Sequence, residues 1–105
     1  MDVQLKRGLL EVSVLAVIRN KPSYGYRIIK DMKEYVEISE STLYTILKRL
    51  EESKMLTVKT VEHNSRLRKY YHITQLGLDK IEEFKEYWPD IVAMYQLITK
   101  EENIV

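Results

Sequence analysis

The sequence predicts a mainly α-helical fold with one small β-hairpin. Three observations lead to this prediction: helical spacing of apolar residues in the first half of the chain, two neighbouring β-rich runs after Met55, and a long final stretch with helical spacing. A chain of 105 residues with 45% hydrophobic content falls within the usual size of one domain and can fill one core. We therefore expect one compact unit, in which residues 1–73 form a body and residues 74–105 a C-terminal helix.

Two helices are expected at the start of the chain. Apolar residues recur at helical spacing over residues 4–20, and Pro22 then breaks the pattern. Ser23 is suited to cap a second helix over residues 24–35. Gly25 lies in the first turn of that helix, where a glycine lowers helix stability and usually marks the close approach of another helix.

A third helix is expected to begin near Ser39, which is a good N-cap, and Glu40 in its first turn complements the helix dipole. An inward stripe at i, i+3, i+4 and i+7 consists of Leu43, Ile46, Leu47 and Leu50. The opposite, polar face consists of Ser41, Thr45, Lys48 and Glu52, with Thr42 and Arg49 on one flank and Tyr44 on the other. We expect this polar face to be exposed.

A hairpin is expected after the third helix. Residues 56–61 and 67–73 are rich in β-forming side chains, and a polar tip of His63, Asn64, Ser65 and Arg66 separates them. Asn64 is the tip residue that best tolerates a positive φ. The cations Arg66, Arg68 and Lys69 concentrate positive charge at and beyond this tip.

The last helix is expected to begin after Thr74, a suitable N-cap. Its apolar residues keep a 3,4,3,4,3 spacing, which is typical of a coiled-coil seam and requires a partner helix. The seam consists of Ile81, Phe84, Trp88, Ile91, Tyr95 and Ile98. Pro89 cannot donate a helical hydrogen bond, and because the seam keeps its phase through it, we expect a kink rather than a break. The partner that this seam predicts is a second copy of the chain, which gives a homodimer.

Charge and composition indicate an anionic partner and a cytoplasmic location. Residues 1–72 hold 14 Lys and Arg against 9 Asp and Glu, whereas residues 73–105 hold 3 against 7. A basic body suits an anionic partner, although mixed charges of this kind are also typical of solvated helix faces. The sequence has no cysteine, and its longest apolar run, residues 14–18, is far shorter than the roughly 20 residues of a membrane span. We expect no membrane partner.

The order helix, helix, helix, hairpin, helix predicts a winged helix-turn-helix that binds double-stranded DNA. The third helix would enter the major groove, and the hairpin, or wing, would contact the adjacent backbone or minor groove. On the second helix we assign Tyr24 to DNA and Tyr26 to packing. The candidate DNA-binding residues are Tyr24, Ser41, Thr42, Tyr44, Thr45, Lys48, Arg49, Arg66, Arg68 and Lys69. The alternative is an ordinary amphipathic helix beside a hairpin whose charges only confer solubility.

Three motifs in this order resemble the PadR family of transcriptional regulators, and the resemblance covers nearly the whole chain. They are residues 23–28 (SYGYRI), residues 41–51 (STLYTILKRLE) and residues 68–74 (RKYYHIT), followed by Gly77. The resemblance implies a winged helix-turn-helix that dimerises through its C-terminal helix and usually represses genes near its own. The short tail resembles the smaller branch of the family. The wing departs from the family pattern because its tip lacks glycine.

In the smaller branch, some members bind flat aromatic drugs in a pore between subunits, where a tryptophan eleven residues after the motif glycine lines the pore. Trp88 stands at that distance from Gly77, so the resemblance implies a small aromatic ligand there. Pro89 directly after this tryptophan is unexpected. The alternative is that Trp88 only packs the dimer seam.

Catalysis and metal binding are not indicated by the sequence. His63 and His72 flank the hairpin, but no cysteine joins them and no metal-ligand spacing is present, so solvated positions are expected. The sequence has no glycine-rich phosphate loop and no serine in a nucleophile elbow. We expect a regulator and not an enzyme, with no cofactor and no metal. A winged-helix module that binds proteins instead of DNA is the alternative function.

Overall fold

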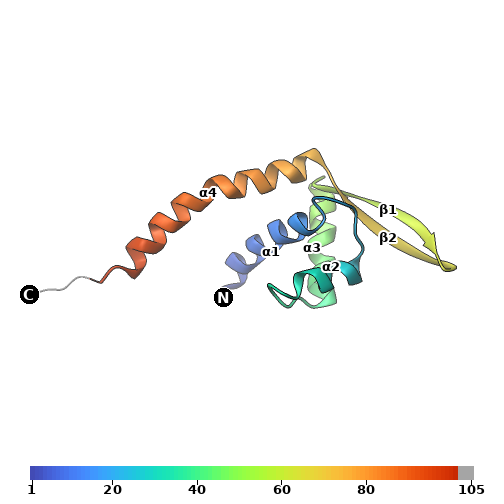
Figure 1. Cartoon of the computed structure of the whole chain (residues 1–105), viewed down its shortest axis with the longest axis horizontal. Coiled ribbons are helices and arrows are strands. Elements are labelled where there is room, and N and C mark those ends of the chain that lie inside the picture. Colours follow the sequence, from blue (N-terminus) through green and yellow to red (C-terminus); the bar gives the residue numbers. More distant parts are fainter. Residues whose placement is uncertain (102–105) are drawn as a thin grey trace, which may run out of the picture.

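Helices dominate the chain, and one antiparallel hairpin projects from them (Figure 1). The computed structural model describes residues 1–101. Within them the elements are α1 (Val3–Val17), α2 (Gly25–Met32), α3 (Glu40–Glu52), β1 (Leu56–His63), β2 (Arg66–Ile73) and α4 (Gln75–Thr99). The prediction of a mainly α fold with the order of a winged helix-turn-helix is confirmed. The last four residues of the segment expected as a C-terminal helix lie outside the described part.

Short polar side chains cap three of the helices. The Asp2 carboxylate accepts hydrogen bonds from two backbone N–H groups at the start of α1, at 3.1 and 3.2 Å. The Ser39 hydroxyl accepts from the Thr42 N–H at 3.2 Å, and the Thr74 hydroxyl accepts from the Gly77 N–H at 3.2 Å. The two predicted caps of α3 and α4 are confirmed, because each hydroxyl satisfies an N–H group that has no partner within its helix.

The second helix differs from its prediction at both ends. Its N-cap is Tyr24, which makes no side-chain capping bond, and the helix ends at Met32. Ser23 pairs with β2 instead of capping: its N–H donates to the Tyr71 carbonyl at 3.2 Å and its own carbonyl accepts from the Tyr71 N–H at 2.7 Å. This bridge fixes the start of α2 against the hairpin.

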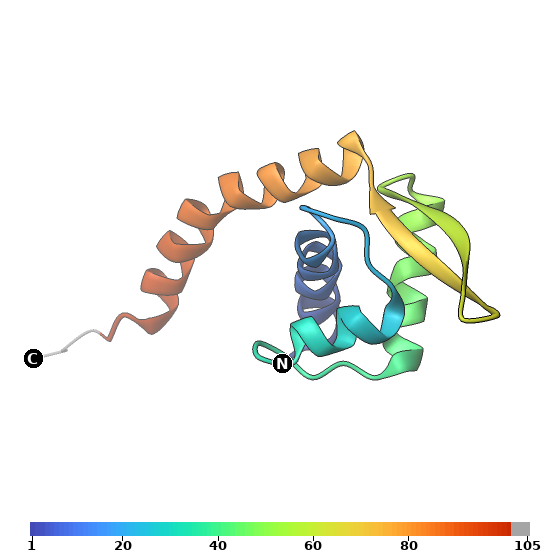
Figure 2. The ribbon, with the colours of Figure 1, turned by 45° about the vertical axis from the view of Figure 1, so that its right-hand side comes forward.

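The core lies where α1, α2 and α3 meet (Figure 2). All four residues of the predicted inward stripe of α3 are buried. The same core cluster contains Leu10, Val14 and Leu15 of α1, its C-cap residue Ile18, and Ile28 and Met32 of α2. Burying the stripe turns the opposite face of α3 toward solvent.

The hairpin is longer and its turn tighter than the sequence indicated. Strand pairing runs from Leu56 opposite Ile73 to His63 opposite Arg66, so only Asn64 and Ser65 form the turn. Both turn residues have positive φ, 50° and 63°, which is the backbone geometry that continues the twist of the strands in a two-residue hairpin. The expected four-residue tip is therefore wrong, although the positive φ expected of Asn64 is confirmed.

Helix α4 leaves the body and continues through Pro89, and its ribbon curves in the second half (Figures 1 and 2). A bend without a break agrees with the predicted kink, since Pro89 cannot donate to the carbonyl one turn earlier. Ile81, the first residue of the expected seam, is 4% exposed and packs inside the core instead. Its burial anchors the first turns of α4 to the body.

Gly77 is expected to be required for that anchoring. A Cβ at this position would lie against the Met55 carbonyl oxygen and 2.6 Å from Cγ1 of Ile73. We expect Gly77→Ala to lower the free energy of unfolding in urea by about 1–3 kcal/mol, the usual cost of overpacking. The control is Gly8→Ala in α1, where a Cβ would meet no atom within 4 Å, so that the greater helix propensity of alanine gives about 0.5–1 kcal/mol of stabilisation. Equal effects of the two substitutions would contradict the packing described for Gly77.

Candidate nucleic-acid interface

The outward face of α3 is exposed, as the sequence predicted. Ser41, Thr42, Tyr44, Thr45 and Lys48 are all open to solvent. The Thr45 hydroxyl donates to the Ser41 carbonyl at 2.8 Å, and the Ser39 hydroxyl donates to that of Thr42 at 2.9 Å. These bonds hold the small hydroxyls close to the helix. The surface at Ser41, Thr42 and Thr45 is therefore polar but has no long side chain to keep a docking partner away.

Arg49, a predicted DNA contact, is engaged with α1. Its Nη1 lies 3.0 Å from Oε1 of Glu11, and the two side chains are 37% and 22% exposed. Among the described residues this is the ion pair that joins two helices, whereas the others lie within α4. Arg49 therefore holds α3 against α1, and sequence reasoning missed Glu11 because the partners are 38 residues apart.

Tyr44 lies on the opposite flank of α3, against the start of α2. A Cβ on Gly25 would collide with the Tyr44 hydroxyl and lie 2.9 Å from its Cζ. The close helix approach expected at Gly25 is thus confirmed. The absence of a side chain at Gly25 lets the Tyr44 ring pack there while half of its surface stays open to solvent.

Arg68 on the wing is held by two tyrosines. Its guanidinium lies 4.0 Å above the centroid of the Tyr24 ring and donates to the Tyr70 hydroxyl at 3.4 Å. The rings of Tyr24 and Tyr70 meet edge to face with centroids 5.6 Å apart. The bond to Tyr70 is the main cause that raises the pKa of Arg68. The two tyrosine contacts hold this cation, which like any arginine is always charged, beside the start of α2.

The tyrosines of α2 differ partly from expectation. Tyr24, assigned to DNA, is half-buried beneath Arg68, while Tyr26, assigned to packing, is 71% exposed. Tyr70 was not singled out, although its position two residues after Arg68 places both on one face of the strand. That alternation is the signal that could have identified it.

A groove joins these parts into one surface. It has a volume of about 680 Å³ and lies between the start of α2, α3 and the hairpin. Three of its lining tyrosines come from α2 and α3, and Arg68 and Lys69 bring positive charge from β2. No acidic side chain belongs to the described lining. Arg66 stands at the exposed end of the same strand, outside the lining of this groove.

The other predicted site residues lie on α4, away from this surface. Trp88 and Ile98 are 54% and 78% exposed, Tyr95 is also exposed, and Phe84 and Ile91 are half-buried. The apolar seam after Ile81 is thus largely uncovered in the single chain. Over residues 1–101, no cluster of three or more metal-ligating side chains occurs and no helix has the length and apolarity to cross a membrane.

Comparison with known proteins relates the chain to one family. Residues 14–83 match the transcriptional regulator PadR-like family. The chain is 30% identical over 96 residues to an uncharacterised protein of Lysinibacillus sphaericus, and the match covers 87% of this chain and 88% of that protein.

Solved structures share the fold. A PadR family transcriptional regulator from Eggerthella lenta is 31% identical with a TM-score of 0.83, covering 94% of this chain and 89% of that one. Bacillus subtilis PadR in complex with operator DNA has a TM-score of 0.68 at 19% identity, covering 92% of this chain and 50% of that one, and this likeness concerns the fold alone. The family consists of transcription regulators, which confirms that the chain is not an enzyme. The chain belongs to the PadR-like family of transcriptional regulators.

Proposed function

We propose that this regulator binds double-stranded operator DNA, with α3 in the major groove and the wing on the adjacent backbone. The observation that carries the proposal is the exposed polar face of α3, which adjoins a groove whose charged lining residues are Arg68 and Lys69. The operator complex of the related Bacillus subtilis PadR supports it. The proposal includes a cytoplasmic location, since the relatives named above come from bacteria, whose DNA lies in the cytoplasm.

The residues divide by the contact that their chemistry allows. Thr45 and Lys48 reach base edges, while Ser41 and Thr42 lie close to bases and phosphates. The residues that contact phosphates are Tyr24, Tyr44, Arg66, Arg68 and Lys69. Arg49 acts indirectly: its guanidinium is already paired with Glu11, and this ion pair holds α3 in position against α1.

The proposed DNA-binding unit is a homodimer. Residues 1–73 contact DNA, and the C-terminal helix joins two subunits through Phe84, Trp88, Ile91, Tyr95 and Ile98, which the single chain leaves exposed or half-buried. Two copies of α3 then read half-sites about one helical turn, roughly 34 Å, apart. The operator is accordingly an inverted repeat.

Repression follows if the dimer occupies DNA that RNA polymerase needs. A small planar aromatic ligand stacked on Trp88 would lie at the proposed subunit contact. By binding one arrangement of the subunits better than the other, it would change the spacing of the two α3 helices and release the operator. The exposed indole supports this step, since half of its surface is free in the single chain.

DNA binding is tested with Lys48→Ala on the upstream DNA of the protein's own gene. Removal of this one side chain from the interface is expected to weaken binding by about 1–3 kcal/mol without unfolding the protein, whereas the control Lys85→Ala on α4 should bind as wild type. Wild-type affinity should fall steeply between about 50 and 200 mM salt, because bound phosphates release counterions. Binding that ignores salt, or no binding, would favour a winged-helix module for protein partners.

The dimer is tested by placing charge on the seam. Tyr95→Glu combined with Ile98→Glu should convert the dimer into a folded monomer, because both side chains are exposed in the single chain and would face a partner helix. Gln96→Glu, off the seam, is the matched control and should leave the dimer intact. Sedimentation velocity gives the mass, and circular dichroism checks folding. A double variant that still sediments as a dimer would place the contact elsewhere.

Ligand stacking is tested through the fluorescence of Trp88, the single tryptophan of the chain. Planar aromatic cations are expected to quench its emission saturably, because an indole face attracts both aromatic rings and positive charge. A compact aliphatic ammonium ion of the same charge has no ring to stack and should quench far less. A panel of planar cations without saturable quenching would leave Trp88 as a packing residue of the seam.

A further inference from the structure

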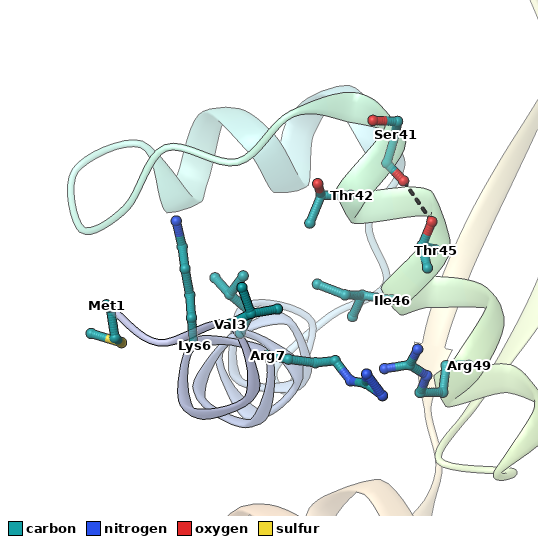
Figure 3. Close-up of a pocket in the computed structure, with 10 residues that line it drawn as sticks. Met1, Val3, Lys6, Arg7, Ser41, Thr42, Thr45, Ile46 and Arg49 are labelled. Atoms are coloured by element: carbon teal, nitrogen blue, oxygen red, sulfur yellow. Dashed lines mark hydrogen bonds between the residues drawn. The ribbon is translucent and has the colours of Figure 1, made fainter.

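A second groove, of about 450 Å³, lies between the start of α1 and α3 (Figure 3). Leu10 and Ile46 provide part of its apolar lining. The hydroxyls of Ser41, Thr42 and Thr45 on α3 border it, and the same three residues belong to the proposed DNA-binding face of α3. This groove therefore continues the proposed DNA interface on the flank of α3 that lies away from Tyr44.

The charge of this groove is strongly positive. Lys6, Arg7 and Arg49 line it, and its described lining contains no acidic residue. Figure 3 shows the side chains of Arg7 and Arg49 pointing toward one another. Glu11 compensates Arg49 alone, since Lys6 and Arg7 form no ion pair within residues 1–101. Lys6 and Arg7, which have no counterion among the described residues, favour an anion beside them.

The helix that carries Lys6 and Arg7 is held in place relative to α3. Asp2 caps the helix and thereby orders the turn that precedes Lys6. The ion pair between Glu11 and Arg49 ties the next turn of α1 to the last turn of α3. The backbone at Lys6 and Arg7 thus keeps a set position relative to α3, from which both exposed side chains can extend toward a DNA backbone.

We propose that Lys6 and Arg7 bind backbone phosphates of the operator on the flank of α3 opposite the wing. The inference rests on the proposed function and adds a surface to it. A helix in the major groove, which is about 12 Å wide, lies between two sugar–phosphate strands. The cations of the wing lie beside one flank of α3 and those of α1 beside the other, so that each subunit contacts both strands.

The test compares the salt dependence of operator binding for wild type and Lys6→Ala/Arg7→Ala. Each phosphate that the protein neutralises contributes about 0.9 to the slope of log K against log salt. We expect the slope of the double variant to be smaller by about 0.9 for every phosphate that it no longer binds, with weaker binding at low salt. The control, Arg19→Ala/Lys85→Ala, removes the same charge beyond the far end of α1 and on α4, and should change the slope far less.

Two further measurements keep the outcomes distinct. Lys6→Arg/Arg7→Lys preserves both charges and should retain the wild-type slope. Sedimentation of the alanine double variant should give the wild-type mass. A double variant with the wild-type slope overturns this inference while leaving the proposed function in place, and a change of mass would assign the groove to subunit contact. A wild-type protein that binds no DNA overturns both.

Discussion

Burial of one apolar stripe on α3 determines the arrangement of everything around it. Leu43, Ile46, Leu47 and Leu50 lie along one side of a helix of 13 residues and contribute much of the core that α1 and α2 complete. Truncating a side chain of this kind to alanine usually costs about 2–5 kcal/mol, so the helix cannot rotate to expose it. Its polar side faces solvent for that reason. The same orientation of the helix directs Tyr44 toward the start of α2 and Arg49 toward α1. The proposed DNA surface is in this sense a by-product of core packing.

Much of this was predictable because periodicity and capping act locally. The stripe, the caps at Ser39 and Thr74 and the continuation of the last helix through Pro89 each depend on residues within a turn or two. The errors arose where a distant segment decides. Ser23 pairs with Tyr71 across the fold instead of capping its own helix, and the hairpin turn is short because cross-strand pairing extends to Arg66.

The same division applies to the candidate site. The sequence identified which side chains have the chemistry to bind DNA, and most of them are exposed as expected. It could not reveal that Arg49 and Arg68 are already engaged, since their partners Glu11 and Tyr24 come from other parts of the chain. These interactions convert flexible cations into positioned ones, which reduces the conformational entropy that binding would otherwise cost. Preorganisation is thus a tertiary property that residue type alone does not predict.

The exposed polar face of α3 and the core stripe occupy one helix but share no side chain. Ser41, Thr45 and Lys48 contribute nothing to the core, and the stripe residues are closed to solvent. Substitution on the outer face therefore leaves stability nearly unchanged, as is usual for exposed positions. Under the proposed function, selection can accordingly alter which operator is recognised without first acquiring compensating mutations in the fold. A gene duplication would provide two regulators whose targets can diverge quickly on an unaltered scaffold.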